Sequence, residues 1–416
     1  MTIRPFELGR DLEAVRRIWE ETRWIDRGDK GDAAALRTML AGSPAFVAEL
    51  DGEAECVTIG SPATIRHLRR DIPLGIVAAV ATSPRGRRAG LASRATAALV
   101  ARDAGAGMMV SALGMFEQGF YTRLGFGNGP AELRWSIDPA SLAVDARART
   151  PCRITTEHSD EAHSAMGKRA LRHGGVRILN PAHTAADMGW TEHPLGLGYR
   201  DAAGELTHFL WGEMRDENGP LVITAMAWRE PGQLRELLAL LRSLGDQAYR
   251  IKLLEPAGIH LQDFISRPLR ESGTSESRQW RKGAEAEAWW QARINDVLGC
   301  LAHTSLPTSS SLGGPALEFN LRLDDPIGKF LPADAPWRGT GGDYIVHLGA
   351  ECGAAAGSRK GLPSLNAGIG GFTRLWLGCA EAGVIAASGE IEAPKQLLDD
   401  LEATLRLPVP RTGCEF

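Results

Sequence analysis

The sequence predicts an α/β fold with three domains, two of which are related by an internal repeat. At 416 residues the chain exceeds the usual size of a single domain. Its first part alternates strand-like with helix-like segments. The order strand, turn, helix, strand at residues 75–113 recurs at residues 221–254 with lower fidelity, which indicates a duplicated domain. We expect domains at residues 1–145, 146–295 and 296–416.

Hydrophobic spacing predicts the elements of the first domain. Apolar residues share one face of a helix at residues 11–22, and Asp51-Gly52 is a dipeptide typical of a hairpin turn. A continuous apolar run at residues 75–82 is typical of a strand covered on both faces. The expected elements are strands at 3–6, 45–50, 54–58, 75–82, 108–112 and 131–137, and helices at 11–22 and 91–104.

The other two domains are less regular in pattern. A linker rich in Pro, Asp, Arg and Ala spans residues 138–151. After it we expect a strand at 221–229, a break at Pro231-Gly232, a helix at 233–244 and a strand at 248–254, without the glycine loop of the first copy. A third region begins near Trp289-Trp290. It contains strands at 318–323 and 343–348, a helix at 396–405, and a tail at 407–416 that its two prolines keep out of a helix.

Composition excludes several classes of protein. Lys and Arg number 47 and Asp and Glu 51, a net charge of -4 that is too balanced for a general nucleic-acid binder. Six dispersed cysteines without a C-x-x-C pair favour a reduced, cytoplasmic protein. Neither a secretory signal nor a membrane span is expected. No metal is expected either: His158 and His163 are five residues apart, no ligand set surrounds them, and we interpret them as surface residues.

One short motif carries the chemistry. Arg87-Arg88-Ala89-Gly90-Leu91-Ala92 follows the apolar strand and precedes the helix at 91–104. Unpaired backbone N–H groups at a helix N-terminus, together with its dipole, favour an anion, and small residues let phosphates approach. Arg85, Arg87 and Arg88 would add cationic donors. The motif resembles the pyrophosphate loop of the GNAT acetyltransferase superfamily, and residues 119–127 resemble the F-Y-x-x-x-G-F segment of that superfamily.

Further segments resemble the Eis (enhanced intracellular survival) family of bacterial GNAT acetyltransferases. They are residues 84–91, 117–121, 290–297 and the terminal Cys414-Glu415-Phe416. The resemblance implies two tandem GNAT-like domains, of which the second is degenerate, and a C-terminal α+β domain similar to sterol carrier proteins. It also implies a homohexamer, acetyl-CoA as cosubstrate, and acetylation of amines on polycationic small molecules, with aminoglycoside antibiotics and hence antibiotic resistance as leading candidates.

The resemblance also implies roles for individual residues. Tyr121 would be the general acid, and the C-terminal carboxylate of Phe416 the general base. Residues that correspond to the acetyl-CoA site are Val80, Ala81, Thr82, Arg87, Arg88, Ala89, Gly90, Leu91, Ala92, Ser93, Phe116 and Glu117. Residues that correspond to the acceptor site are Trp24, Asp26, Leu36 and Glu415, with Leu36 in place of an aromatic wall and Glu415 facing substrate.

Two other functions fit the same sequence. The acceptor could be a lysine or N-terminus of a protein or peptide, because an acidic cleft attracts any cation. Alternatively, the chain could be a non-catalytic carrier or scaffold that uses its C-terminal domain. The intact phosphate loop together with Tyr121 favours catalysis.

Overall fold

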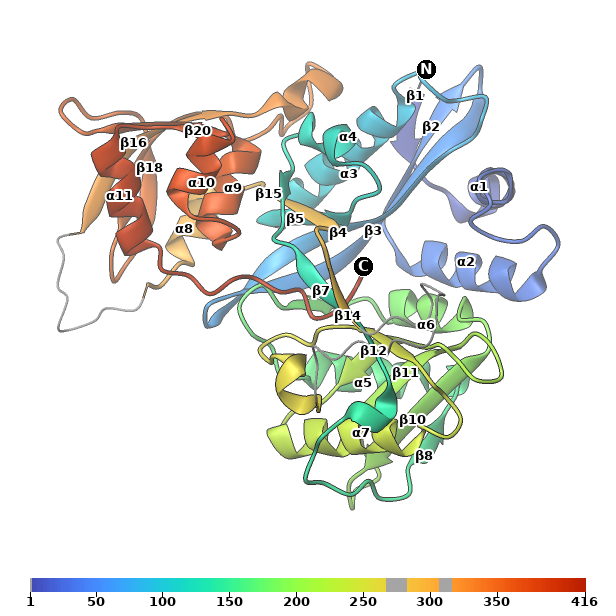
Figure 1. The fold of residues 1–416 in the computed structure, drawn as a ribbon. Helices are drawn as coiled ribbons and strands as arrows, with labels where there is room; N and C mark the ends of the chain where they lie inside the picture. Colours follow the sequence, from blue (N-terminus) through green and yellow to red (C-terminus); the bar gives the residue numbers. More distant parts are fainter. Residues whose placement is uncertain (1, 267–282, 307–315) are drawn as a thin grey trace.

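The fold is organised around three β-sheets (Figure 1). The structure is a computed structural model and describes residues 2–266, 283–306 and 316–416. We call the three sheets with their helices the first, second and third unit. This α/β architecture confirms the expected fold class, and the similarity of the C-terminal part to sterol carrier proteins stays a prediction.

The first unit has an eight-stranded sheet of order β1-β2-β3-β4-β5-β15-β6, with β9 paired to β3. Its strands are β1 (Thr2–Pro5), β2 (Ala45–Leu50), β3 (Glu53–His67), β4 (Arg70–Thr82), β5 (Val110–Gly114), β6 (Gly127–Asn128), β9 (Val176–Ile178) and β15 (Trp290–Ile294). Most neighbours are antiparallel, but β4 and β5 are parallel. The predicted hairpin turn at Asp51 and Gly52 is confirmed: both have positive φ, as the favoured two-residue turn requires.

Helices cover both faces of the first sheet. They are α1 (Leu8–Glu21), α2 (Lys30–Gly42), α3 (Leu91–Gly105) and α4 (Gln118–Thr122). Val15, Ile18 and Trp19 of α1 are buried against strand residues such as Val57, as the helical spacing predicts. Leu99 of α3 packs in a separate core with other strand residues, so the helices form two layers around the sheet.

The second unit has a seven-stranded sheet of order β14-β7-β13-β12-β11-β10-β8. Its strands are β7 (Glu132–Ile137), β8 (Cys152–Ile154), β10 (Pro194–Arg200), β11 (Leu206–Met214), β12 (Leu221–Ala227), β13 (Ile251–Leu254) and β14 (Gly283–Glu287), and its helices are α5 (Ser159–Lys168), α6 (Pro181–Gly189) and α7 (Pro231–Ser243). Its parallel pair, β12 and β13, matches β4 and β5 of the first unit. Pro231 starts α7 instead of breaking the chain before it, because proline is tolerated in the first turn of a helix.

The first two units exchange strands. Residues 131–137 were expected in the first domain, yet β7 lies in the second sheet between β13 and β14. The segment at Trp290, expected to open the third region, forms β15 between β5 and β6 of the first sheet. Hydrophobic pattern indicates a strand but not its partner, so sheet membership departs from the boundaries expected at residues 145 and 295.

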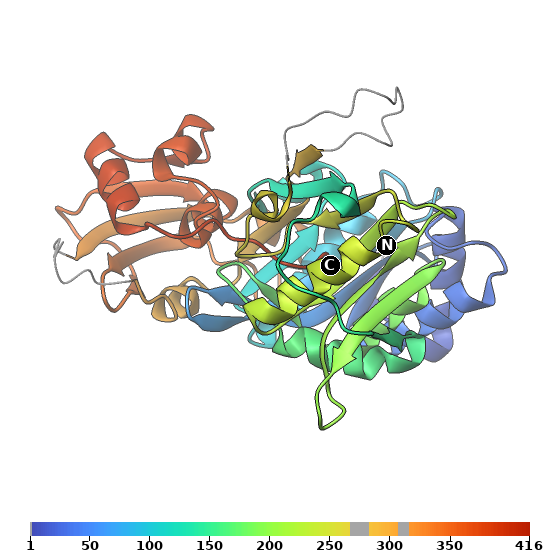
Figure 2. The ribbon, with the colours of Figure 1, turned by 60° about the horizontal axis from the view of Figure 1, so that its bottom comes forward.

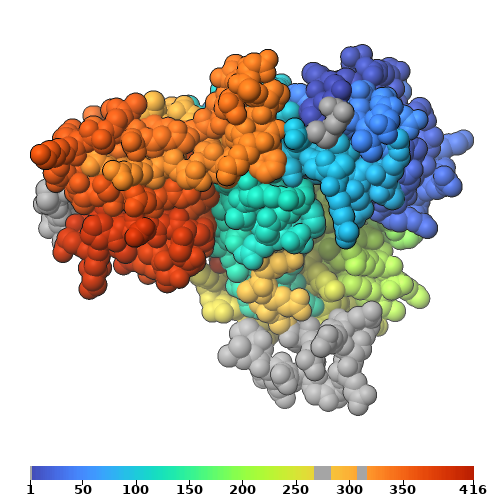
Figure 3. All heavy atoms as spheres, turned by 90° about the horizontal axis from the view of Figure 1, so that it is seen from above, coloured from blue at the N-terminus to red at the C-terminus, as the bar shows by residue number. Residues whose placement is uncertain are grey.

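The third unit has a five-stranded sheet of order β18-β17-β16-β19-β20. Its strands are β16 (Leu317–Asp324), β17 (Gly342–Leu348), β18 (Gly353–Ala356), β19 (Ser364–Gly368) and β20 (Ile391–Glu392), and its helices are α8 (Val297–Ala302), α9 (Ile369–Leu377), α10 (Ala382–Ala387) and α11 (Lys395–Thr404). It shares one hydrophobic core with the first sheet, and seen from above it packs against the first unit (Figure 3). Among the described residues, no helix has the length and apolar character needed to cross a membrane.

Short one-turn 3-10 helices complete the connections. They are η1 (Pro139–Ser141), η2 (Thr156–His158), η3 (Leu261–Phe264) and η5 (Pro326–Phe330). After α11 the chain continues as an extended segment, which we call the C-terminal tail (residues 405–416). The tail leaves the third unit and ends between the first and second units (Figures 1 and 2). The tail therefore brings the end of the chain from the third unit to the boundary between the other two.

Candidate acetyl-transfer site

The loop between β4 and α3 has the shape of an anion-binding site. Gly90 is the N-cap of α3 and contributes no side-chain cap, so the first N–H groups of the helix remain available to a ligand. Its φ of 74° lies in the left-handed region that glycine adopts at little cost. Arg88 is also left-handed, at φ 64°, a strained conformation of the kind that clusters at ligand sites. The side chains of Arg87 and Arg88 are exposed beside this helix end.

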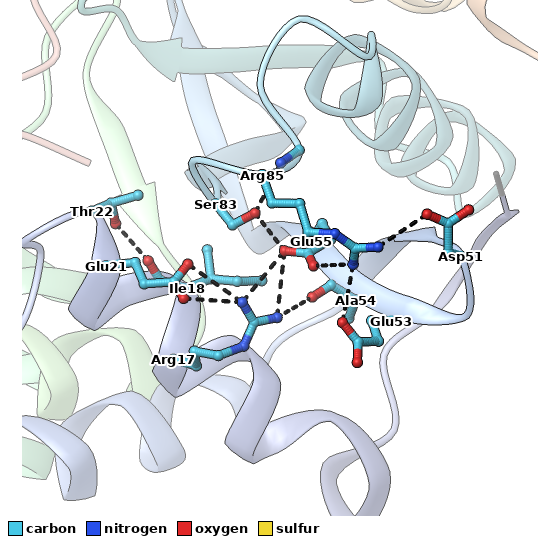
Figure 4. Close-up of polar contacts among 11 residues, drawn as sticks. Arg17, Ile18, Glu21, Thr22, Asp51, Glu53, Ala54, Glu55, Ser83 and Arg85 are labelled. Carbon is cyan, nitrogen blue, oxygen red and sulfur yellow. Dashed lines mark hydrogen bonds and ion pairs between the residues drawn. The ribbon is translucent and has the colours of Figure 1, made fainter.

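A buried carboxylate holds the start of this loop in place (Figure 4). Glu55 on β3, whose side chain is 1% exposed, accepts a hydrogen bond from the hydroxyl of Ser83. The Ser83 hydroxyl oxygen in turn accepts the backbone N–H of Gly86 at 3.0 Å. Burial raises the pKa of Glu55, but the Ser83 and arginine hydrogen bonds outweigh it and keep this pKa below its usual value. Sequence reasoning missed Glu55 because nothing local to the loop indicates it.

Arg85 does not act as predicted. Its guanidinium donates to Glu55 at 2.8 Å, to Glu53 at 3.0 Å and to Asp51 at 3.0 Å (Figure 4). These three carboxylates occupy donors of Arg85 that were expected to bind phosphate. Arg85 therefore helps to hold the loop, and Arg87 and Arg88 are exposed in the turn that leads into α3.

The two parallel strands next to the loop separate along their length. β4 pairs with β5 from Leu74 to Val77, and β4 then continues to Thr82 in contact with β3 alone. The stretch that follows Val77 contains Val80, Ala81 and Thr82, three residues predicted for the cosubstrate site. Beyond Val77, the edge of β4 that faces β5 forms no backbone hydrogen bonds with β5. An extended ligand with amide groups can pair with such an edge.

Tyr121 lies at the point where the strands separate. Its side chain is 3% exposed and packs in one cluster with Val77 and Leu113, the last paired residues of β4 and β5. Burial raises the pKa of the Tyr121 hydroxyl above its ordinary value, so it keeps its proton at neutral pH. Phe116, 76% exposed, stands edge-on to this ring at 6.0 Å. Glu117 occupies the N-cap position of α4 and is exposed, but its side chain forms no capping hydrogen bond with the helix.

The C-terminal residue reaches the same place from the other end of the chain. A Cβ built on Gly114, the last residue of β5, would lie 3.1 Å from the backbone oxygen of Phe416, an approach that suits glycine. The Phe416 ring packs on Trp289 with centroids 5.1 Å apart. The terminal residue is thus anchored by its ring next to the end of β5, while Tyr121 is buried against the residue before Gly114.

A cavity of about 690 Å³ opens beside the chain terminus, between the first and second units. Ala78 and Ala79 of β4 line it together with Phe416, so it begins where the strands separate. Its aromatic lining residues are Trp19, Trp24, Trp190, Phe209, Trp211 and Phe416. Its acidic lining residues are Asp187, Glu192, Glu213 and Glu415. The lining also includes Arg169, and this size and mixture of apolar walls with a few charged groups are typical of a small-molecule site.

Only two of the four residues predicted for the acceptor site line this cavity. Trp24 lines the cavity and is 49% exposed. Glu415 lines it too, but its carboxylate pairs with Arg134 of β7. Asp26 is exposed outside the lining, and Leu36 is wholly buried in the core of the first unit. Leu36 therefore does not widen the cavity, contrary to its expected role.

The second unit supplies cavity-lining residues that the sequence did not reveal. His183 of α6 lines the cavity and is 3% exposed; burial lowers its pKa, but the neighbouring Asp187 carboxylate, 3.3 Å away, raises it more, so the net shift is upward. His163 of α5 lines the cavity as well and binds Thr184 at 2.9 Å, so it is not the surface residue we expected. No spacing in the sequence relates α5 and α6 to β4.

The diverging parallel strands, the loop with its uncapped helix and the buried tyrosine together define the fold of the GNAT N-acetyltransferases. Solved structures with this fold match the whole chain. Eis1 from Mycobacterium abscessus has a TM-score of 0.74 and 15% identity, with 100% of both chains covered. A GCN5-related N-acetyltransferase from Anabaena variabilis reaches 0.76 at 14%, and a conserved protein from Enterococcus faecalis 0.78 at 14%, again with 100% of both chains covered. No family model and no curated protein matches the sequence.

Proposed function

We propose that this chain is an acetyl-CoA-dependent N-acetyltransferase that acetylates amines of polycationic small molecules, with aminoglycosides as the leading candidates. The observation that carries the proposal is the position of Tyr121 and of the chain terminus on consecutive residues at the end of β5. Tyr121 packs in one cluster with Leu113, Phe416 lies against Gly114, and the cavity that Phe416 lines contains acidic residues. Resemblance to the Eis family and the shared fold of Eis1 support it. The homohexamer and the cytoplasmic location implied by that resemblance remain predictions.

The residues around the loop fit acetyl-CoA, which supplies the acetyl group. The N-terminus of α3 from Gly90 to Ser93, with Arg87, Arg88 and Ala89 before it, would hold the pyrophosphate. The free edge of β4 from Val80 to Thr82 would pair with the pantetheine amides. Phe116 and Glu117, both exposed, with Phe116 next to the Tyr121 ring, would contact the same cosubstrate.

One side chain and the main-chain terminus divide the proton transfers. Attack by an amine requires its free base, and the terminal carboxylate of Phe416, charged at neutral pH, attracts the ammonium and accepts its proton, directly or through water. The Tyr121 hydroxyl, kept protonated by burial, donates to the departing thiolate. Acidic cavity residues hold the other positive charges of the acceptor, which orients one amine toward the gap.

A thiol-release assay tests this function. Acetyl-CoA is mixed with the protein and with aminoglycosides, polyamines, lysine peptides or neutral amines, and free thiol is measured. We expect release with the polycationic small molecules. Release with lysine peptides alone would favour a protein acetyltransferase, and no release with any amine despite acetyl-CoA binding by calorimetry would favour a carrier or scaffold.

The acidic cavity residues provide a sharper test. The double variant Asp187→Asn/Glu192→Gln removes two charges from the cavity wall and should raise KM for the amine about tenfold, while KM for acetyl-CoA stays unchanged. Glu217→Gln, an exposed carboxylate of the same unit outside the cavity lining, is the matched control. Equal amine KM in all three proteins would contradict the acceptor assignment.

A further inference from the structure

The C-terminal tail is tied to the second unit by a buried carboxylate. Glu132, the first residue of β7, is 0% exposed. One oxygen of Glu132 accepts three donors: the backbone N–H of Thr412 at 3.1 Å, the hydroxyl of Thr412 at 3.3 Å and the indole N–H of Trp290 at 2.9 Å. The Thr412 carbonyl in turn accepts the N–H of Val176 at 2.9 Å, so the tail is held from two sides. Charge-assisted hydrogen bonds away from water are among the stronger ones in proteins.

Two ion pairs of opposite polarity fix the register of the tail. Arg134, two residues after Glu132 on β7, pairs with Glu415 of the tail. Glu255, which follows β13 and has a side chain 1% exposed, lies 3.5 Å from the guanidinium of Arg411. The tail therefore presents a positive charge to Glu255 and a negative charge to Arg134. A slip of one residue, about 3.3 Å, would break both pairs at once.

The tail also occupies the position in the second unit that corresponds to the open gap of the first. β12 pairs with β13 from Leu221 to Ile223 and then continues to Ala227 paired with β11 alone, which repeats the separation of β4 from β5. Residues 413–415 of the tail line a small space of about 40 Å³ there, together with residues 223–226 and 253–256. In the second unit the gap is thus closed by the chain itself.

We propose that the second unit serves as a docking socket for the C-terminal tail, with Glu132, Arg134 and Glu255 as positioning residues that place the Phe416 carboxylate at the end of β5. The inference rests on the proposed function, because a placed carboxylate matters only if it acts in the reaction. It gives the second GNAT-like unit a task other than cosubstrate binding, since its strand gap already holds the tail.

Seating of the tail can be measured without any activity. Carboxypeptidase A removes an accessible C-terminal phenylalanine, and mass spectrometry of the full-length protein follows the loss of Phe416. Arg134→Glu should speed this release about tenfold, because attraction to Glu415 becomes repulsion. The double variant Arg134→Glu/Glu415→Arg restores the pair and should return the rate toward wild type. Each rate is divided by that of the matching synthetic peptide 405–416, which removes the protease's own sequence preference.

A matched control and a second variant complete the seating test. Arg153→Glu introduces the same charge change at an exposed residue of β8 in the same unit and should leave the release of Phe416 unchanged. Thr412→Val removes one donor to Glu132 without a change of charge and should also speed release, which covers the case in which Arg134→Glu fails to fold. Release at the wild-type rate in both tail-contact variants would overturn the socket.

Kinetics then connect seating to the reaction. Where release is about tenfold faster, in Arg134→Glu or in Thr412→Val, we expect kcat to fall about tenfold with KM for acetyl-CoA unchanged. A loosened tail with wild-type kcat would overturn the positioning role while leaving the proposed function intact. A wild-type protein without acetyl transfer to any amine would refute the proposed function instead, and the release rates would still decide whether the socket exists.

Discussion

Replacement of Glu55 by Gln should weaken acetyl-CoA binding even though Glu55 is behind the phosphate loop and not in it. The wild-type carboxylate accepts hydrogen bonds from Ser83 and from Arg85 at 2.8 Å, and Arg17 lies 3.4 Å away. A glutamine keeps one acceptor oxygen and turns an N–H₂ group toward these donors. Loss of a charge-assisted hydrogen bond at this 1% exposed site should cost about 2 kcal/mol of folding free energy.

Part of that cost should appear as a weaker complex, because Ser83 orients the backbone of Gly86 in the loop. If acetyl-CoA binding must supply about 1.4 kcal/mol of that free energy to order the loop, the Kd for acetyl-CoA rises about tenfold. Isothermal titration calorimetry measures this Kd, and a thermal scan gives the loss of stability. Glu53→Gln is the control, since Glu53 also binds Arg85 but is 71% exposed and should matter little. A lower melting temperature with unchanged Kd would refute the reasoning.

Three further predictions concern the acid, the base and pH. Tyr121→Phe should lower kcat about 100-fold with acetyl-CoA affinity intact by calorimetry, because the hydroxyl acts when the thiolate departs; wild-type turnover would assign the proton to another donor. A C-terminal extension beyond Phe416 replaces the carboxylate with an amide and should abolish transfer, whereas an N-terminal tag should not; full activity with an extension verified by mass spectrometry would exclude this base. Arg149 donates to Glu236 and, against the opposing effect of burial, lowers the pKa of Glu236 to about 2. This carboxylate therefore contributes stability above its unfolded pKa of about 4.3, and the contribution is lost as pH falls toward 2. Because Arg149 is 62% exposed, Glu236→Gln should cost only about 1 kcal/mol at pH 7 and nothing near pH 2, measured as the pH dependence of the melting temperature.

The parts of the molecule that could be predicted from the sequence are those that local physics decides. The strand at 75–82, the helix from Leu91 and the loop between them follow from an apolar run, helical spacing and glycine at a left-handed position. The extended tail follows from its prolines. In each case the signal and the structure lie within about fifteen residues of one another.

The acceptor side could not be predicted in the same way. Asp187 and Glu192 lie more than 100 residues from β4 in sequence, and only the packing of the second unit on the first brings them to the cavity. Leu36 shows the reverse error: its sequence position suggested a pocket wall, but its apolar side chain is better accommodated in the core next to Met39. Arg85 was expected to bind phosphate because it lies next to the glycine loop in sequence. Its carboxylate partners, Glu53 and Glu55, lie on another strand, so the loop sequence does not reveal them.

The exchange of strands explains why the chain terminus can serve a site in the first unit. β15 carries Arg293 into the first sheet, where its guanidinium forms an ion pair with Asp325 of the third unit at 2.6 Å, with both side chains at most 1% exposed. A buried pair of this kind is costly to break because either partner alone would be an unpaired charge. β7 joins the first unit to the second in a similar way, because the chain runs directly from β6 of the first sheet into a strand of the second sheet. The exchanged strands and this ion pair thus join the three units, and the role proposed for the Phe416 carboxylate depends on such a fixed position.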